Sequence, residues 1–189
     1  MPCIPALPPD PAAPFARPRD AVTAQAKLDR PYLLGLGRDN GSVVYAERND
    51  AGRWLWREAR ADGVAAGDPI PSQGAQGPIR AALDGRMIGH YSLVGDEDRY
   101  TFFDPADARA WQAIVDAFPG KRVELASWST DRRKIVVLVE SRSDSPAYAV
   151  VDLAARSADW LGAQYVDLKP GDVAPREPVR FKAADGMPL

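Results

Sequence analysis

The sequence predicts a mainly β protein built from repeated units, and three observations lead to this prediction. Short apolar or alternating segments recur between residues 32 and 161, and turn-forming residues separate them. Turns that begin with aspartate recur at Asp39, Asp84 and Asp131, which are 45 and then 47 residues apart. One segment alone, near residues 105–118, has the apolar spacing of a helix.

The first predicted unit covers about residues 32–70 and begins with short strands joined by tight turns. Residues 39–41 (DNG) and 49–52 (NDAG) have the composition of turns. The segments beside them are apolar or rich in β-branched and aromatic residues, and Trp54 and Trp56 alternate so that both face one side. We expect strands at residues 33–37, 42–47 and 53–57.

The same plan returns in two further units, at about residues 78–120 and 123–162. Each contains β-rich segments separated by turn signals, such as Asp84-Gly85 and residues 144–146 (DSP). We expect strands at residues 79–83, 87–93 and 100–103 in the second unit, and at 124–128, 135–140, 148–153 and 159–161 in the third.

The repeat can be checked by counting from each turn aspartate. An aliphatic residue follows four positions later, an aromatic residue sixteen or seventeen positions later, and a polar residue four beyond the aromatic. These sets are Val43, Ile88 and Ile135; Trp56, Tyr100 and Tyr148; and Arg60, Asp104 and Asp152. A repeat of this length is typical of a four-stranded β-propeller blade. We therefore predict about three four-stranded antiparallel blades over residues 31–176, an incomplete propeller.

A single helix is predicted inside the second unit, near residues 105–118. Asp104 suits the N-cap, Pro105 suits the first helical position, and an acidic residue follows in the first turn. The proline-glycine pair at 119–120 then stops the helix. The apolar face of this helix is expected to contain Ala108, Trp111, Val115 and Phe118.

The two ends of the sequence do not follow the repeat. Seven of the first 20 residues are proline, so we expect residues 1–30 to be disordered, with a proline-rich ligand for a partner as the alternative. Residues 162–176 are expected to form a linker. A last short strand is expected at Val179–Lys182, within residues 177–189.

Composition argues against several classes of function. The 189-residue chain has a net charge of −2, so no basic excess predicts binding to nucleic acid or to an acidic membrane surface. No apolar run approaches the ~20 residues that span a bilayer, and the N-terminus lacks a secretory pattern, so a cytoplasmic location is favoured. His90 and Cys3 are the only histidine and cysteine, which disfavours a histidine-activated nucleophile, a zinc site and an intrachain disulfide.

Two groups of residues invite a functional interpretation, but we expect structural roles for both. His90 is expected to be a packed or hydrogen-bonded histidine, although a functional role stays open. The tryptophans are expected to pack between units or beneath the helix rather than line a ligand surface. They are Trp54, Trp56, Trp111, Trp128 and Trp160.

Polar motifs are interpreted in the same way. The acidic run Asp96-Glu97-Asp98 is expected at a hairpin tip rather than on a cation, and Gly35-x-Gly37 lacks the third glycine of a dinucleotide site. Turn and strand-end hydrogen bonds are expected of Ser127, Ser129 and Asp131, and a solvated hairpin flank of Arg132-Arg133-Lys134. No catalytic or metal-binding residue is therefore assigned, the binding residues are unassigned, and no cofactor is expected.

Several segments together resemble one enzyme family. Residues 127–131 (SWSTD) and 148–153 (YAVVDL) resemble a blade of the prolyl oligopeptidase family of serine peptidases. Residues 99–105 (RYTFFDP), with a helix behind them, resemble a bacterial branch of that family. Residues 181–189 (FKAADGMPL) resemble the strand by which those chains leave the propeller and enter the α/β-hydrolase domain. The resemblance covers roughly residues 32–189.

The resemblance implies the C-terminal part of a propeller that caps a peptidase active site and filters peptides by size. A family propeller usually has about seven blades, and the Gly-x-Ser-x-Gly nucleophile elbow occurs nowhere in this sequence. No family catalytic residue is therefore carried onto this chain, which is expected to be inactive alone. The partners implied are peptide substrate in the full enzyme, the missing blades and hydrolase domain, or a second copy of the chain.

The sequence thus favours a non-catalytic propeller portion that would gate and orient peptide substrates in the full enzyme. The alternative is a stand-alone β-propeller-like protein-binding module with a proline-rich tail. A small independent hydrolase is disfavoured by the single histidine and the absent elbow.

Overall fold

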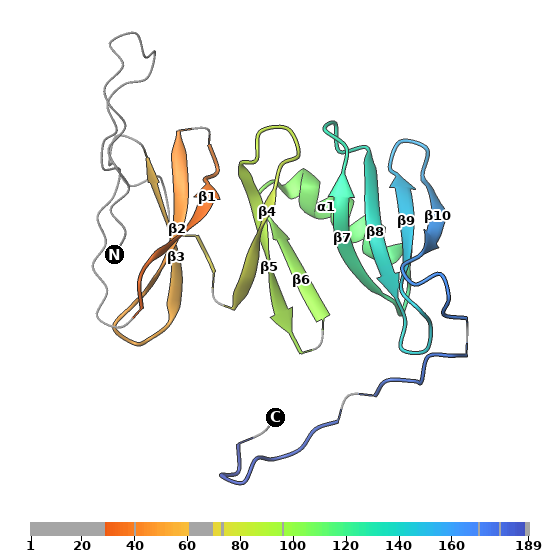
Figure 1. Cartoon of the computed structure of the whole chain (residues 1–189). Helices are drawn as coiled ribbons and strands as arrows, with labels where there is room; N and C mark the ends of the chain where they lie inside the picture. Colours follow the sequence, from red (N-terminus) through yellow and green to blue (C-terminus); the bar gives the residue numbers. More distant parts are fainter. Residues whose placement is uncertain are drawn as a thin grey trace, which may run out of the picture.

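Three antiparallel sheets and one helix make up the described part of the protein (Figure 1). The computed structural model describes residues 29–39, 41–60, 70–72, 74–95, 97–169, 171–177 and 179–187. These residues contain ten strands, so the predicted mainly β class is confirmed. The predicted disorder of residues 1–30 falls, except for residues 29 and 30, outside the described residues.

The first sheet is a meander of β1 (Tyr32–Leu36), β2 (Ser42–Arg48) and β3 (Trp54–Arg60). Alternate side chains of β2 are buried, as the period of two in a strand requires. Ile70 forms an isolated antiparallel bridge with Trp56 of β3. Since Trp56 also pairs with Ala46 of β2, Ile70 lies at the open edge of β3, where a fourth strand would pair.

The second sheet contains β4 (Ala75–Arg80), β5 (Met87–Val94) and β6 (Glu97–Phe102). The strand predicted at 79–83 is wrong in position, because the chain has already entered a hairpin at Ala81, whose N–H donates to the Arg86 carbonyl at 2.9 Å. Pro78 is tolerated in β4 because β4 is an edge strand.

The third sheet has four strands in the order β10-β9-β8-β7. The four strands are β7 (Arg122–Trp128), β8 (Lys134–Glu140), β9 (Ala147–Asp152) and β10 (Ser157–Ala163). This unit agrees with the predicted four-stranded plan. Among the described residues the first two sheets have only three strands each, which corrects the expectation of four strands for every unit.

Each sheet begins with the same hairpin, and this hairpin gives the structural repeat. Gly37, Ala81 and Ser129 each donate a backbone hydrogen bond to the carbonyl five residues later, at 2.8, 2.9 and 2.8 Å. The equivalent hairpins therefore begin 44 and then 48 residues apart, which corrects the predicted spacing of 45 and 47. The two spacings differ because Asp84 lies three residues after its hairpin donor Ala81, whereas Asp39 and Asp131 lie two residues after theirs. A register shift also interrupts the pairing of β4 with β5 between Ile79 and Arg80.

Helix α1 (Pro105–Asp116) follows the second sheet and has the predicted start. Asp104 is its N-cap and accepts a hydrogen bond from the Ala106 N–H at 2.7 Å. Trp111 and Phe118, just beyond the helix end, are buried as predicted. Val115 is only half-buried and Ala108 is exposed, while Asp107 and Ile114 are buried in addition. The face is displaced because Asp107 makes an ion pair with Arg132 of the next sheet.

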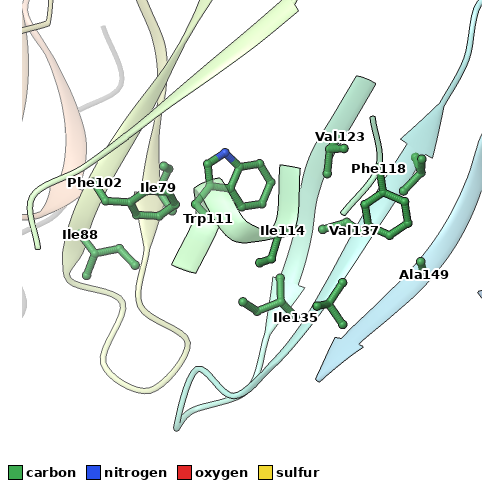
Figure 2. Packing of buried hydrophobic residues seen from close by; sticks show 12 residues of the cluster. Ile79, Ile88, Phe102, Trp111, Ile114, Phe118, Val123, Ile135, Val137 and Ala149 are labelled. Atoms are coloured by element: carbon green, nitrogen blue, oxygen red, sulfur yellow. The ribbon is translucent and has the colours of Figure 1, made fainter. Parts of the chain in front are cut away.

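The core consists of two clusters, each between neighbouring sheets. The smaller joins the first and second sheets and contains Val44, Ala46, Trp56, Ile70 and Met87. The larger joins the second sheet, the helix and the third sheet. Figure 2 shows Trp111 and Ile114 of α1 between Phe102 and Ile79 on one side and Ile135 and Val137 on the other. The helix thus fills the space between two sheet faces.

The chain after β10 is exposed and mostly irregular. Residues 179–187 contain an isolated bridge position at Lys182 but no strand, which corrects the strand predicted at Val179–Lys182. Phe181 is 59% exposed, so no sheet covers its side chain. A turn follows, in which the Ala183 N–H donates to the Met187 carbonyl at 2.8 Å. None of the described strands pairs with these residues, so their sequence pattern does not become a ladder.

Replacing Ile114 tests whether helix α1 stabilises the protein by filling the space between the second and third sheets. Ile114 is fully buried in the larger cluster, so Ile114→Ala should lower the free energy of unfolding by about 2–5 kcal/mol through lost burial and a residual cavity. Chemical denaturation followed by circular dichroism measures this loss. The matched control is Arg109→Ala on the exposed face of the same helix. An equal loss of stability in both variants would contradict the stabilising role of Ile114 between the two sheets.

Candidate functional site

The three turn aspartates lie in the equivalent hairpins at one end of the sheets, the upper end in Figure 1. Each carboxylate accepts a hydrogen bond from the backbone N–H two residues later, which makes each an Asx turn. The pairs are Gly41 with Asp39, Arg86 with Asp84, and Arg133 with Asp131. The Gly41 N–H lowers the pKa of Asp39, and the Ser129 hydroxyl lowers the pKa of Asp131. The repeated aspartates therefore have a structural role.

A small cavity of about 120 Å³ opens where the three hairpins meet. Its lining includes one arginine from each unit, namely Arg38, Arg86 and Arg132, together with Asp104 and Asp107. Arg132 pairs with Asp107, and Arg86 pairs with Asp84 at 3.2 Å. Because the cations already have carboxylate partners, this cavity offers little free charge to an anion. Of these ion pairs, Arg132–Asp107 joins the third sheet to the helix, whereas the pairs of Arg38 and Arg86 each lie within one unit.

Glu58 of β3 is the most deeply buried carboxylate at this end. Its side chain is 2% exposed, and its oxygens accept from the backbone N–H and Nε of Arg38 at 2.6 and 2.5 Å and from the Ser42 hydroxyl at 2.6 Å. Gly37 provides the space, since a Cβ at that position would lie 2.1 Å from Ser42 Oγ. The second glycine of Gly35-x-Gly37 is thus needed for this network, a role that the sequence analysis missed.

Arg80 links the first strands of neighbouring sheets. Its guanidinium donates to the carbonyls of Leu34 and Leu36 in β1, the latter at 3.2 Å, and to the Gly85 carbonyl at 2.8 Å. Gly35 allows this approach, because a Cβ there would lie 2.6 Å from the guanidinium. The Trp128 indole of β7 donates in turn to the Arg80 carbonyl at 3.4 Å. The strands β1, β4 and β7 are therefore connected along one side of the molecule.

A groove of about 550 Å³ lies between the second and third sheets, and we call it the inter-sheet groove. Residues of β4, β5 and β6 form one wall, and residues 124–128 of β7 form the other. Tyr91, Tyr100 and Trp128 provide half-buried aromatic rings, and Asp98 and Glu124 provide carboxylates. The combination of flat apolar rings with a few polar groups is typical of a ligand site.

Two carboxylates, those of Asp98 and Glu124, lie in the groove near Tyr100. Arg80 also lines the groove, but its guanidinium donates to carbonyls of β1 and of the adjoining hairpin. Asp98 and Glu124 share one cation, Arg122, at 3.0 Å each. Burial raises the pKa of Tyr100 to about 12, and the nearby charges of Asp98 and Glu124 act in the same direction. The Tyr100 hydroxyl accepts from the Leu125 N–H at 3.1 Å, so this ring also bridges the two walls.

A wider cleft of about 700 Å³ lies at the opposite end of the third sheet. Its lining mixes cations with anions and contains no aromatic residue; among the members are Lys121, Arg122, Glu140, Arg142 and Arg176. Arg176, from the segment after β10, pairs with Glu140. The charges of this cleft largely pair with one another. The inter-sheet groove is therefore the better candidate site.

His90 lies in the core between the first and second sheets. Its ring packs edge-on against Trp56 at 6.0 Å between centroids, and it is 6.5 Å from Phe103. Burial lowers the pKa of His90, and a hydrogen bond to the Pro71 backbone acts in the opposite direction. Its Nδ1 is buried and has no hydrogen-bond partner. The predicted packed histidine is thus what the structure contains, away from the groove.

The tryptophans follow the packing prediction with one exception. Trp56 joins the first two sheets, Trp111 lies beneath the helix, and Trp128 contacts Phe102 across the second and third sheets at 5.5 Å. Trp54 packs against Tyr32 within the first sheet at 5.2 Å. Trp160 contacts Phe118 but remains 58% exposed, because β10 is the open edge of its sheet.

Of the polar motifs, only the arginine run departs clearly from expectation. Arg133 and Lys134 have side chains 72% and 66% exposed, as predicted for a hairpin flank. Arg132 is only 26% exposed, because it pairs with Asp107 and lies over the Trp128 ring at 5.6 Å. Its backbone has φ +58°, which directs the chain through a tight turn.

The remaining motifs occupy turns and strand ends. Ser129 donates to Asp131 at 2.6 Å, and Ser127 is exposed on β7 beside the groove. Glu97 and Asp98 open β6 directly after the β5–β6 hairpin, whereas Asp96 lies outside the described residues. Asp98 binds Arg122 and lines the inter-sheet groove, so this residue of the acidic run contributes to the groove.

The described residues of the groove show no pairing of a serine with a histidine. His90 is buried between the first two sheets, so no serine of the groove has a histidine beside it. The same residues contain no group of three or more His, Cys, Asp or Glu placed to hold a metal ion. No helix in this part of the chain is long and apolar enough to cross a membrane.

Comparisons of the chain with protein-family models, with curated proteins and with solved structures gave no match.

The buried carboxylate Glu58 gives a direct test of the hairpin network. Glu58→Ala should lower the free energy of unfolding by about 1–3 kcal/mol, because buried donors of Ser42 and Arg38 lose their acceptor. The matched control is Glu47→Ala, which removes the exposed ion pair with Arg57 at 2.6 Å and should cost less than about 1 kcal/mol. Urea denaturation of both variants measures the difference; equal losses would count against the network.

The lowered pKa of His90 predicts a pH dependence of stability. In the unfolded chain histidine titrates near 6.5, and in the folded chain His90 binds its proton only at lower pH. Between these two pKa values the unfolded state holds more protons, so stability should fall as pH drops below about 6.5.

Thermal melts between about pH 7.5 and 5 measure this effect, and His90→Phe should flatten the curve there. The lowered pKa values of Asp39, Asp131 and Asp152 act near and below about pH 4, so acid sensitivity in that range should persist in the variant. An unchanged slope in His90→Phe would refute the assignment.

Proposed function

We propose that this chain is a non-catalytic β-propeller portion of a prolyl oligopeptidase-like serine peptidase, in which it would gate and orient peptide substrates. The observation that carries the proposal is the stack of three antiparallel sheets that begin with equivalent hairpins at Gly37, Ala81 and Ser129. In a propeller, successive antiparallel sheets pack face to face and their first strands line the axis.

The contacts between first strands support this reading of the sheets as blades. Arg80 of β4 donates to β1 carbonyls, and Trp128 of β7 donates to the Arg80 carbonyl. Three consecutive first strands thus lie along one side, as blades around an axis would place them. The Ile70 bridge beside β3 stands where the fourth strand of the first blade would pair.

The outward face of the third sheet supports an extended array. Val136 and Leu138 of β8 point away from the core that buries Ile135 and Val137, and both are only half-buried. Repeat arrays bury such faces against a further repeat. Another blade, from the same polypeptide or from a second copy, would complete this packing.

A role in gating rests on the inter-sheet groove and on the absence of catalytic chemistry among the described residues. The groove offers aromatic rings and carboxylates to a peptide, whereas His90 is buried elsewhere and does not line the groove. The sequence contains no Gly-x-Ser-x-Gly, so the serine, acid and histidine of a triad would come from another part of the enzyme. The same groove favours the second candidate, a stand-alone protein-binding module.

A serine-reactive fluorophosphonate probe separates the two candidates. The purified 189-residue chain should not be labelled. The native gene product, immunoprecipitated from producing cells with an antibody to this chain, should contain a labelled polypeptide, either longer than this chain or bound to it. An unlabelled native species would contradict the peptidase proposal and favour the binding module. Labelling of the purified chain itself would contradict both.

A further inference from the structure

The proline spacing of the N-terminal segment has a period of three. Prolines occur at positions 2, 5, 8, 11 and 14, and the next position in this series is Arg17. A polyproline II helix has three residues per turn, so residues three apart lie on one edge. In that conformation the segment would present five prolines and then an arginine along a single edge. The other residues of the segment do not repeat in this way.

The inter-sheet groove has the chemistry that recognises such an edge. Grooves that bind polyproline II segments present aromatic rings to the prolines. The rings of Tyr91 and Tyr100 lie 6.0 Å apart and 31° from parallel, and Trp128 adds a third ring on the opposite wall. The Tyr91 ring lies directly against the backbone of Gly77 in β4, since a Cβ on Gly77 would come within 2.7 Å of the ring.

The charges of the groove and the segment are complementary. Asp98 and Glu124 line the groove and share the guanidinium of Arg122, which Glu140 also approaches at 3.9 Å, so three carboxylates surround one cation there. Arg80 also lines the groove, but its guanidinium donates to carbonyls of β1 and of the adjoining hairpin. Arg17 continues the proline edge and would bring a cation to these carboxylates. A proline edge that ends in arginine therefore matches a ring-lined groove that contains carboxylates.

The chain is long enough for this contact within one molecule. Eleven residues lie between Arg17 and residue 29, where the described chain begins, and these twelve residue-to-residue steps can span about 40 Å at ~3.3 Å each. Packed sheets lie about 10 Å apart, so this tether can pass the first sheet and reach the groove between the second and third.

We propose that the inter-sheet groove binds the chain's own proline-rich segment, with Pro11 and Pro14 against the rings of Tyr91, Tyr100 and Trp128 and Arg17 beside Asp98 and Glu124. The bound segment would occupy the groove and compete with any other peptide for it. This inference does not rest on the peptidase proposal, since it needs only the groove and residues 11–17 of this chain.

Paramagnetic broadening in the full chain tests this contact. Cys3 is the only cysteine, so Cys3→Ser with Ala16→Cys allows one spin label beside Arg17 and off the proline edge. In two-dimensional amide spectra, the label should broaden residues 124–128 of β7 and leave residues 157–163 of β10 sharp. Sharp signals at 124–128 would overturn the proposal.

Matched variants in the labelled chain separate the proline edge from general effects of proline and charge. Pro11→Ala with Pro14→Ala, and separately Arg17→Glu, should abolish the broadening at 124–128. Pro9→Ala with Pro18→Ala, and separately Arg19→Glu, change the same residue types off the edge and should preserve it. Equal loss in the on-edge and off-edge variants would overturn the proposal.

Dilution distinguishes this chain's own segment from other occupants. Broadening that is unchanged over a tenfold dilution supports binding within one molecule. Broadening that falls with dilution, or that appears on an unlabelled, isotope-enriched chain mixed with a labelled one, would identify a second copy as the occupant and refute the intramolecular contact.

Discussion

In the part of the chain that the structure describes, a β-sheet can cover its apolar face only with another sheet or with helix α1, and the remaining architecture follows from that constraint. Val44 and Ala46 of the first sheet are buried against Met87 of the second. The second and third sheets are held apart by helix α1, whose Trp111 and Ile114 occupy the space between their faces. Because each interface depends on its neighbour, the three units are stable as a stack rather than as separate sheets.

Polar contacts at one end fix how the sheets sit on one another. Apolar faces alone allow neighbouring sheets to slide, whereas buried charges are costly unless their partners are correctly placed. The Arg132–Asp107 ion pair joins the third sheet to the helix, and Arg80 joins the second sheet to the carbonyls of β1. Arg132 lies in its hairpin and Arg80 ends β4 beside another, so these links lie at the hairpin end of the sheets.

The candidate site is a product of stacking, since no single sheet contains it. Tyr91 and Tyr100 come from the second sheet, whereas Glu124 and Trp128 come from the third. A ligand in the inter-sheet groove would therefore contact two units together and would favour their association. This coupling between binding and assembly suits a blade-built portion of a larger protein as well as a binding module with its own tail.

The sequence by itself determined the features that depend on local interactions. Alternation located most strands, the turn aspartates located the hairpins, and Asp104 with Pro105 located the start of the helix. Only the tertiary structure decided the buried helix face, the register shift in the second sheet and the burial of Arg132, because their partners lie on other elements. Asp107 meets Arg132 and Tyr100 meets Leu125 across about 25 positions of chain, and such contacts leave no period in the sequence.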